Sequence, residues 1–112
     1  THSAWVHRKH PRPSLLAYSA TKAAIAKFTI GLAQMLVDKG IRVNAVLPGP
    51  IWTPFIPTGM DPEQVKNFGS QSPMGRPGQP AELASAYVYL ASDDASYTTG
   101  ALLPVHGGMA IY

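Results

Sequence analysis

Apolar residues recur every three or four positions between about Leu16 and Lys39, and this spacing predicts one long helix. Two apolar stripes run along it. They consist of Ile25, Phe28, Leu32 and Leu36, and of Ala26, Ile30, Ala33 and Val37. A helix with two apolar faces must be covered on two sides, so we expect a sheet on one side and another helix or subunit on the other. Gly40 then predicts a left-handed helix stop.

Two short runs of β-forming residues, 42–47 and 102–105, predict two strands. The first follows Gly40 directly and is apolar enough for a buried strand, with Asn44 on it in a structural role. Helix, glycine and strand in this order form the return half of a βαβ unit. Pro104 either weakens the prediction of the second strand or places that strand at a sheet edge.

Prolines interrupt the chain from Pro48 to Pro80 and predict a long irregular region. Within it, Asp61 and Pro62 predict the N-cap and first residue of a short helix that ends near Phe68. A loop of this length in a compact domain is usually a lid or a binding loop.

A further amphipathic helix is predicted from Pro80 to about residues 92–94, with Glu82 near the positive end of the helix dipole. Asp93 and Asp94 then mark a helix end and not a catalytic pair. Its apolar face is predicted to comprise Leu83, Tyr87, Leu90 and Ala91. We also expect Tyr87, Tyr89 and Tyr97 to be packing residues.

The composition changes this picture little. A chain of 112 residues with 46% hydrophobic and 13% charged residues forms one globular domain or part of one. Much of the positive charge behind the net +3 lies in residues 7–12, within an irregular segment 1–13. The absence of cysteine excludes a disulfide framework and a zinc–thiolate site and fits the cytoplasm. The sequence has no run of about 18 apolar residues, so no membrane-spanning helix is predicted.

The candidate chemistry begins with Tyr18 and Lys22, which lie four residues apart at the start of the long helix. This spacing places the two side chains on one helix face. A nearby positive charge favours the phenolate and lowers the pKa of a tyrosine from its usual value of about 10. The pair is therefore a candidate acid/base, although tyrosine and lysine also meet at this spacing by chance.

The second candidate is the turn that follows the first strand, Pro48-Gly49-Pro50-Ile51-Trp52-Thr53. Ligands of open parallel sheets bind outside the carboxyl ends of the strands, where this turn is expected. The N–H of Ile51 and the hydroxyl of Thr53 are suited to an amide or a phosphate. Pro-Gly-Pro by itself is more often only a turn.

Four stretches in this order resemble the short-chain dehydrogenase/reductase (SDR) family, and most of all its glucose and ribitol dehydrogenase-like stress proteins. The resemblance covers about residues 13–108. The matching stretches are Pro13-Ser14-Leu15-Leu16-Ala17-Tyr18-Ser19-Ala20-Thr21-Lys22, Ile41-Arg42-Val43-Asn44-Ala45-Val46-Leu47-Pro48-Gly49-Pro50, Met74-Gly75-Arg76-Pro77-Gly78-Gln79-Pro80-Ala81-Glu82 and Leu90-Ala91-Ser92-Asp93-Asp94-Ala95-Ser96.

The resemblance implies an α/β fold, here the C-terminal half of a Rossmann-like doubly wound parallel sheet that occupies residues 1–112. It implies an oxidoreductase that interconverts a hydroxyl and a carbonyl group with NAD or NADP. Tyr18 would exchange the proton with an alcohol or carbonyl substrate, and Lys22 would lower its pKa and bind the cofactor ribose.

By the same resemblance, Tyr18 also contacts the cofactor, and the nicotinamide carboxamide is held by Pro48, Gly49, Ile51 and Thr53. Residues 52–74 would form the substrate lid. The intact family protein is expected to be a homo-oligomer.

The chain also departs from the family. The Gly-rich pyrophosphate turn and the Asn-Ala-Gly segment are absent, and residues 1–12 do not follow the pattern. Trp5 stands thirteen residues before Tyr18, where the family carries a serine, and Ser3 is two positions out of register. We therefore expect this chain alone to be inactive, and the alternative is a truncated, non-catalytic remnant or an oligomerisation piece.

Two other readings of the basic N-terminal segment carry less weight. His2, His7 and His10 lack carboxylate or thiolate partners, so no metal site is expected. The Arg8-Lys9 cluster is too short, with too few aromatic residues, to make a nucleic-acid-binding module the main hypothesis.

Overall fold

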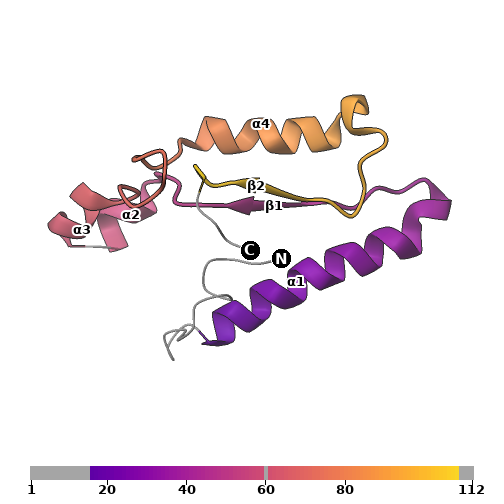
Figure 1. Ribbon diagram of the computed structural model, residues 1–112, viewed down its shortest axis with the longest axis horizontal. Coiled ribbons are helices and arrows are strands. Elements are labelled where there is room, and N and C mark those ends of the chain that lie inside the picture. The colour runs from indigo at the N-terminus through magenta and orange to yellow at the C-terminus, as the bar shows by residue number, and fades with distance from the viewer. Residues whose placement is uncertain (1–15, 60, 109–112) are drawn as a thin grey trace.

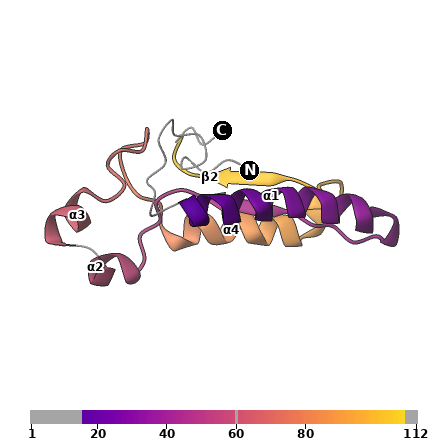
Figure 2. The same cartoon turned by 90° about the horizontal axis from the view of Figure 1, so that it is seen from below.

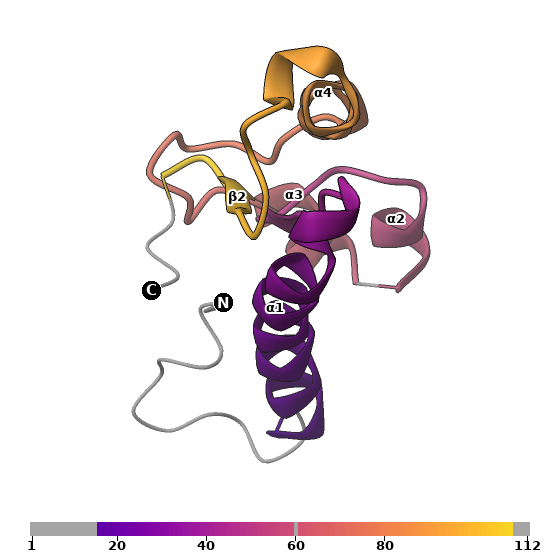
Figure 3. The ribbon, with the colours of Figure 1, turned by 90° about the vertical axis from the view of Figure 1, so that its right-hand side faces the viewer.

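Two parallel strands lie between two helices. The computed structural model describes residues 16–59 and 61–108. Strand β1 (Ala45–Pro48) pairs with β2 (Leu102–Val105) over four residues, from Ala45 opposite Leu102 to Pro48 opposite Val105. Helices α1 (Leu16–Leu36) and α4 (Pro80–Ala91) lie on opposite faces of the pair (Figures 1 and 3). The chain thus has the three layers of an α/β fold.

Small residues form the buried side of α1. Ala26 and Ala33 are each 2% exposed, and an ideal Cβ on Gly100, just before β2, would lie 3.5 Å from the Ala33 side chain. Small side chains allow the helix to approach its neighbours closely. The helix continues as a 3₁₀ turn, η2 (Val37–Lys39), and ends at Gly40, whose φ is +73°. This confirms the predicted helix and its left-handed stop.

The other predicted apolar stripe of α1 is only partly covered by the described part of the chain, and Met35 beside it is exposed as well. Ile25, Phe28 and Met35 are 49%, 67% and 72% exposed, whereas Leu32 and Leu36 are half-buried. Val37 is also exposed, so the prediction that it lies on a covered face was wrong. A two-stranded sheet is too narrow to cover both stripes.

Strand β1 is shorter and less buried than predicted. It begins at Ala45, not at Arg42, and its residues are half-buried or exposed. The reason is that residues 42–44 make side-chain and loop contacts in place of ladder hydrogen bonds. Val43 N–H donates to Thr99 Oγ1, and its carbonyl accepts from Gly100 N–H. The strand also has a described neighbour on one side only.

Asn44 lies just before β1, and its structural role is confirmed. Its amide nitrogen donates to the Thr98 carbonyl at 3.0 Å, and its amide oxygen accepts from Ala101 N–H at 3.0 Å. Arg42 acts in a similar way at the end of α4. Its guanidinium donates to the carbonyls of Leu90, Thr98 and Ser92.

The region between β1 and α4 contains two short helices. Helix α3 (Pro62–Asn67) was predicted, and its cap is confirmed because Asp61 Oδ1 accepts from Gln64 N–H at 2.9 Å. Helix α2 (Phe55–Gly59) was missed. Pro57 seemed to exclude it, but a proline is tolerated in a first helical turn, where the N–H needs no partner. Both helices extend beyond one end of the sheet (Figure 2).

Helix α4 begins at Pro80 and ends at Ala91 as predicted, followed by the 3₁₀ turn η3 (Asp93–Ala95). Its buried residue is Ala86, with Leu83 and Leu90 half-buried. The prediction for the tyrosines was wrong, because Tyr87, Tyr89 and Tyr97 are 55%, 43% and 103% exposed. Ala91, placed on the apolar face, is exposed as well.

Candidate active site

The two parallel strands end side by side and deliver their loops to the same edge of the sheet. Gly49 N–H donates to the Val105 carbonyl at 2.8 Å and extends the pairing by one step. An ideal Cβ on Gly49 would come within 2.7 Å of the Cα of His106. Glycine is therefore required at this position, which explains the Pro-Gly-Pro turn that the sequence singled out.

Helix α1 carries the Tyr-x-x-x-Lys motif in its first two turns. The helix runs opposite to β1, so its first turns, with Tyr18 and Lys22, lie toward the carboxyl ends of the strands (Figure 1). The backbone of both residues is helical, which places them one turn apart. Lys22 is exposed, and the placement of the Tyr18 side chain lies outside the described part of the structure.

The turn after β1 is held by one residue from a distant segment. Gly78 N–H donates to the Pro50 carbonyl, and the Gly78 carbonyl accepts from Trp52 N–H, both at 2.8 Å. These two bonds form an isolated parallel β-bridge in which Gly78 is paired with Ile51. Since alternate residues of an extended chain direct their amides to opposite sides, the Ile51 N–H points away from Gly78. Thr53 follows on the turn and is half-buried.

This turn carries the two groups, the Ile51 N–H and the Thr53 hydroxyl, for which the family resemblance implies a nicotinamide carboxamide. Among the described residues, no backbone hydrogen bond from the Ile51 N–H is found. The Thr53 hydroxyl lies two residues further along the same turn. Pro48 and Gly49 fix the direction in which the turn leaves the strand.

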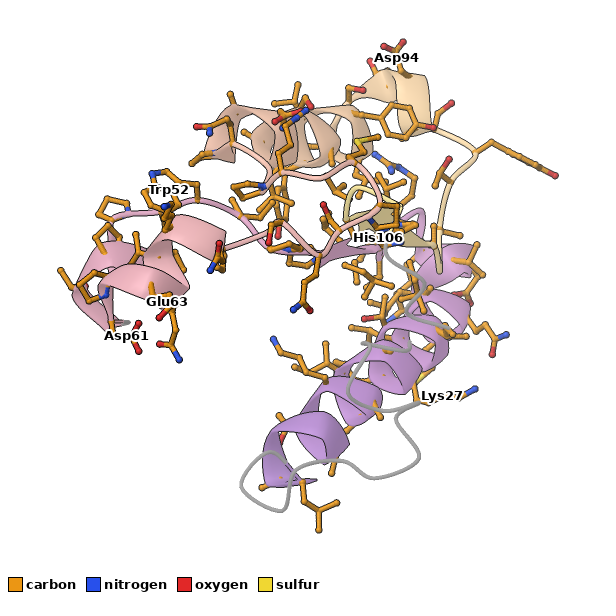
Figure 4. All side chains as sticks on the ribbon, turned by 60° about the vertical axis from the view of Figure 1, so that its left-hand side comes forward. Lys27, Trp52, Asp61, Glu63, Asp94 and His106 are labelled. Carbon is orange, nitrogen blue, oxygen red and sulfur yellow. The ribbon has the colours of Figure 1, made fainter. Side chains whose placement is uncertain are left out.

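A cavity of about 360 Å³ opens at the same edge. The ends of both strands line it, together with residues that precede α4. Its lining includes Pro50, Ile51, Arg76, Gly78, Val105 and His106. Figure 4 shows His106 at the strand end and Trp52 beside α2 and α3, whereas Lys27 on α1 points away from both. The Trp52 ring lies 6.1 Å from that of Phe68, between centroids.

Arg76 and Glu82 form an ion pair beside this cavity that sequence reasoning did not identify. Their side chains meet through two hydrogen bonds, Nη1 to Oε1 at 2.8 Å and Nη2 to Oε2 at 2.9 Å. The bonds from Arg76, together with one from the Gln79 N–H, lower the pKa of the Glu82 carboxyl to about 2. The available signal was the Arg76-Pro77-Gly78 stretch, which had been matched to the family without a role for any residue.

The other candidate sites remain untested. Ser3, Trp5 and the basic cluster at residues 7–12 lie outside the described residues. The described residues contain no group of three or more His, Asp or Glu side chains arranged to hold a metal ion. Over the same part of the chain, no helix is both long and apolar enough to cross a membrane.

Comparison with known proteins identifies the class. A family model described as enoyl-(acyl carrier protein) reductase matches residues 3–110. A glucose and ribitol dehydrogenase homolog from Oryza sativa subsp. japonica is 58% identical over 98 residues, which cover 88% of this chain and 33% of the relative. The chain belongs to the short-chain dehydrogenase/reductase family, and its fold is part of the Rossmann-like parallel sheet of that family.

Two solved structures show the same arrangement. One is a 3-oxoacyl-[acyl-carrier protein] reductase from Brucella melitensis with bound NAD, with a TM-score of 0.75 and 38% identity. The match includes 97% of this chain and 39% of the reductase. The other is an aldohexose dehydrogenase from Thermoplasma acidophilum, with a TM-score of 0.79 and 34% identity. The match includes 99% of this chain and 46% of the dehydrogenase. The chain thus spans about one third of the rice relative and less than half of either structure.

Proposed function

We propose that this chain supplies the acid/base pair and the carboxamide-binding turn of an NAD(P)-dependent oxidoreductase that interconverts a hydroxyl and a carbonyl group. One observation carries the proposal: α1 runs opposite to β1, so its first turns, which carry Tyr18 and Lys22, lie toward the end of the sheet from which the turn at residues 48–53 leaves (Figure 1). Ligands of parallel α/β sheets bind at this edge. Membership of the SDR family supports the same reaction.

The residues divide the work by their chemistry. The Tyr18 hydroxyl gives a proton to the substrate oxygen in reduction and takes it back in oxidation. The Lys22 ammonium favours the phenolate electrostatically and binds the ribose of the cofactor. The Ile51 N–H and the Thr53 hydroxyl hold the carboxamide. The cofactor, when bound, supplies hydride transfer.

Residues 52–74 form the substrate lid in this proposal. The supporting observation is that α2 and α3 stand beyond the sheet, joined to it at the turn after β1 and again near Gly78 (Figure 2). The names of the rice relative and of the aldohexose dehydrogenase favour a polyol or a sugar as the substrate class. We propose the cytoplasm as the location, on the absence of cysteine.

Because this chain alone is expected to be inactive, the test is made in a full-length parent protein that contains it. Turnover of glucose and ribitol, each with NAD⁺ and NADP⁺, is followed by the absorbance of the reduced nicotinamide. Tyr18→Phe should lower kcat by about 100-fold or more, because the proton donor is lost. Lys22→Met should also lower it. The matched controls are Tyr97→Phe, which changes a fully exposed tyrosine, and Lys27→Met, which removes a lysine that points away from the site. Unchanged turnover in Tyr18→Phe would reject the assigned role.

The second candidate function is that of a piece without activity of its own, which associates with a further copy of the protein. The exposed apolar side chains of Ile25, Phe28 and Met35 on α1 favour it. Light scattering should then show an oligomer that Phe28→Gln dissociates. Dinucleotide binding to the chain, titrated with NADH and NADPH by fluorescence, separates the two candidates, since an inactive remnant should bind neither.

A further inference from the structure

The segment that leads into α4, residues 72–79, is here called the strap, because it crosses the carboxyl edge of the sheet. At its C-terminal end Gly78 holds the turn after β1 through two backbone hydrogen bonds, to Pro50 and from Trp52. These are the only backbone hydrogen bonds from the strap to that turn within residues 16–59 and 61–108. The orientation of Ile51, which lies between Pro50 and Trp52, therefore depends on the position of Gly78.

The N-terminal end of the strap is anchored to the loop after β2. Met74 N–H donates to the Gly107 carbonyl at 3.0 Å. Ser72 is 5% exposed, and its hydroxyl donates to the Arg76 carbonyl at 2.9 Å, which fixes the bend between the two anchors. Arg76 thus lies in the middle of the strap, between the contact with β2 and the contact with the turn after β1.

The Arg76 side chain reaches from this middle position to the first turn of α4. Its guanidinium makes the two bonds to the Glu82 carboxylate and a third, at 3.0 Å, to the carbonyl of Pro77. Glu82 Oε1 also accepts from the Gln79 N–H at 3.0 Å. The strap on both sides of Gly78 is therefore tied to a rigid helix. Only a planar fork of two donors can make both bonds to one carboxylate.

We propose that the Arg76–Glu82 pair is a positioning clasp that holds the strap, and through Gly78 sets the turn at Ile51–Thr53 for the cofactor. The role of the pair in cofactor binding rests on the proposed function. The effect of the pair on the position of the strap and of Gly78 does not. Both residues line the cavity at the sheet edge, and in this proposal they position other groups. The pair acts through the strap on residues that bind.

An exposed ion pair could instead be a surface contact of no consequence. The two side chains are 53% and 45% exposed, and such pairs usually contribute little to global stability. The clasp therefore predicts a local effect: the strap loosens while the rest of the chain keeps its stability. Local opening of this kind is visible in the exchange of individual backbone amides.

The experiment measures hydrogen exchange of the Trp52 and Gly78 amides by NMR in the full chain, in Arg76→Lys and in Glu82→Gln. Lysine at position 76 keeps the positive charge but lacks the two parallel N–H donors of the guanidinium. Glutamine keeps an oxygen for the Gln79 N–H but loses the charge. Both variants should raise exchange at these two amides by roughly tenfold. The matched control is Glu63→Gln, which removes an exposed carboxylate from the first turn of α3.

The outcomes separate clearly. Exchange that is unchanged at Trp52 and Gly78, or that rises equally at amides of α1 and α4, would overturn the clasp. Unprotected Trp52 and Gly78 amides in the wild type would also overturn it. Binding of NADH and NADPH is then measured: the clasp variants should bind about tenfold more weakly, with kcat changed less than KM. No binding to the wild type would reject the proposed function, while the exchange data would still decide the clasp.

Discussion

The backbone of Gly49 lies against that of His106 so closely that a Cβ at residue 49 would stand 2.7 Å from the His106 Cα. Two loops far apart in the sequence meet here, one after each strand. Their contact brings the turn that carries Ile51 to the edge where β2 ends, and it depends on the absence of one side chain.

Gly49→Ala should therefore separate the two strand ends. Backbone atoms surround the position and cannot give way as a flexible side chain could, so we expect a loss of about 2 kcal/mol of stability in urea denaturation. Gly31→Ala is the matched control. Gly31 lies in α1 with nothing within 4 Å of an ideal Cβ, and alanine there should stabilise the chain by about 0.5–1 kcal/mol. Equal effects of the two substitutions would contradict this account.

Arg42 stabilises the C-terminal end of α4 by donating to the carbonyls of Leu90 and Ser92 at the helix end, and it also donates to the Thr98 carbonyl in the loop before β2. Arg42→Met keeps much of the apolar stem and removes the donors, so the free energy of unfolding should fall by about 2 kcal/mol. Lys39→Met, at an exposed lysine, is the control and should change it by less than about 0.5 kcal/mol. Loss of helical circular dichroism should accompany the first variant only.

Asn44 offers a test of hydrogen-bond direction. Asn44→Asp preserves an oxygen for the Ala101 N–H but cannot donate to the Thr98 carbonyl when ionised. We expect a loss of about 2 kcal/mol at neutral pH, measured by thermal unfolding. Part of it should return in acid, where the protonated carboxyl can donate. Gln34→Glu, at an exposed position on α1, controls for the added charge; a loss of similar size there would contradict the assignment to Asn44.

The Arg76–Glu82 pair predicts a pH dependence. The pKa of Glu82 is lowered from 4.5 to about 2 in the folded chain. A lowered pKa means that the folded state holds the proton more weakly than the unfolded state, so the contribution is complete above about pH 4.5 and is lost as the pH falls toward 2. The exchange protection of the Trp52 and Gly78 amides in the wild type, relative to Glu82→Gln, should show this loss between those pH values. Because both groups are exposed, high salt should weaken it. A difference that is independent of pH would refute the assignment.

Signals confined to a few neighbouring residues predicted the helices well. Gly40 gave the end of the long helix, Asp61 and Pro62 the start of α3, and Pro80 the start of α4, because a cap or a stop acts through the hydrogen bonds of its own turn. The bounds of β2 were likewise predicted in full. Helix α2 was the exception, since a proline that usually breaks helices stands in its first turn.

The start of β1, the exposure of the tyrosines and the strap could not be predicted in this way. Residues 42–44 continue the β-forming run of residues 45–47 in the sequence, yet they bond to loop residues at 98–100, more than fifty positions away. The tyrosines fit an apolar helix face, but whether a face is buried depends on what packs against it.

For the candidate site, the sequence by itself determined the chemistry: a phenol and an ammonium one helical turn apart, and a proline–glycine turn after a strand. Only the tertiary structure decided that Gly49 must lack a side chain, that Gly78 orients Ile51, and that Arg76 and Glu82 hold the strap between them. The physical reason is range. Residue identity and helical spacing act within a few residues, whereas these contacts form only when segments remote in the chain are brought together by the parallel pairing of β1 and β2.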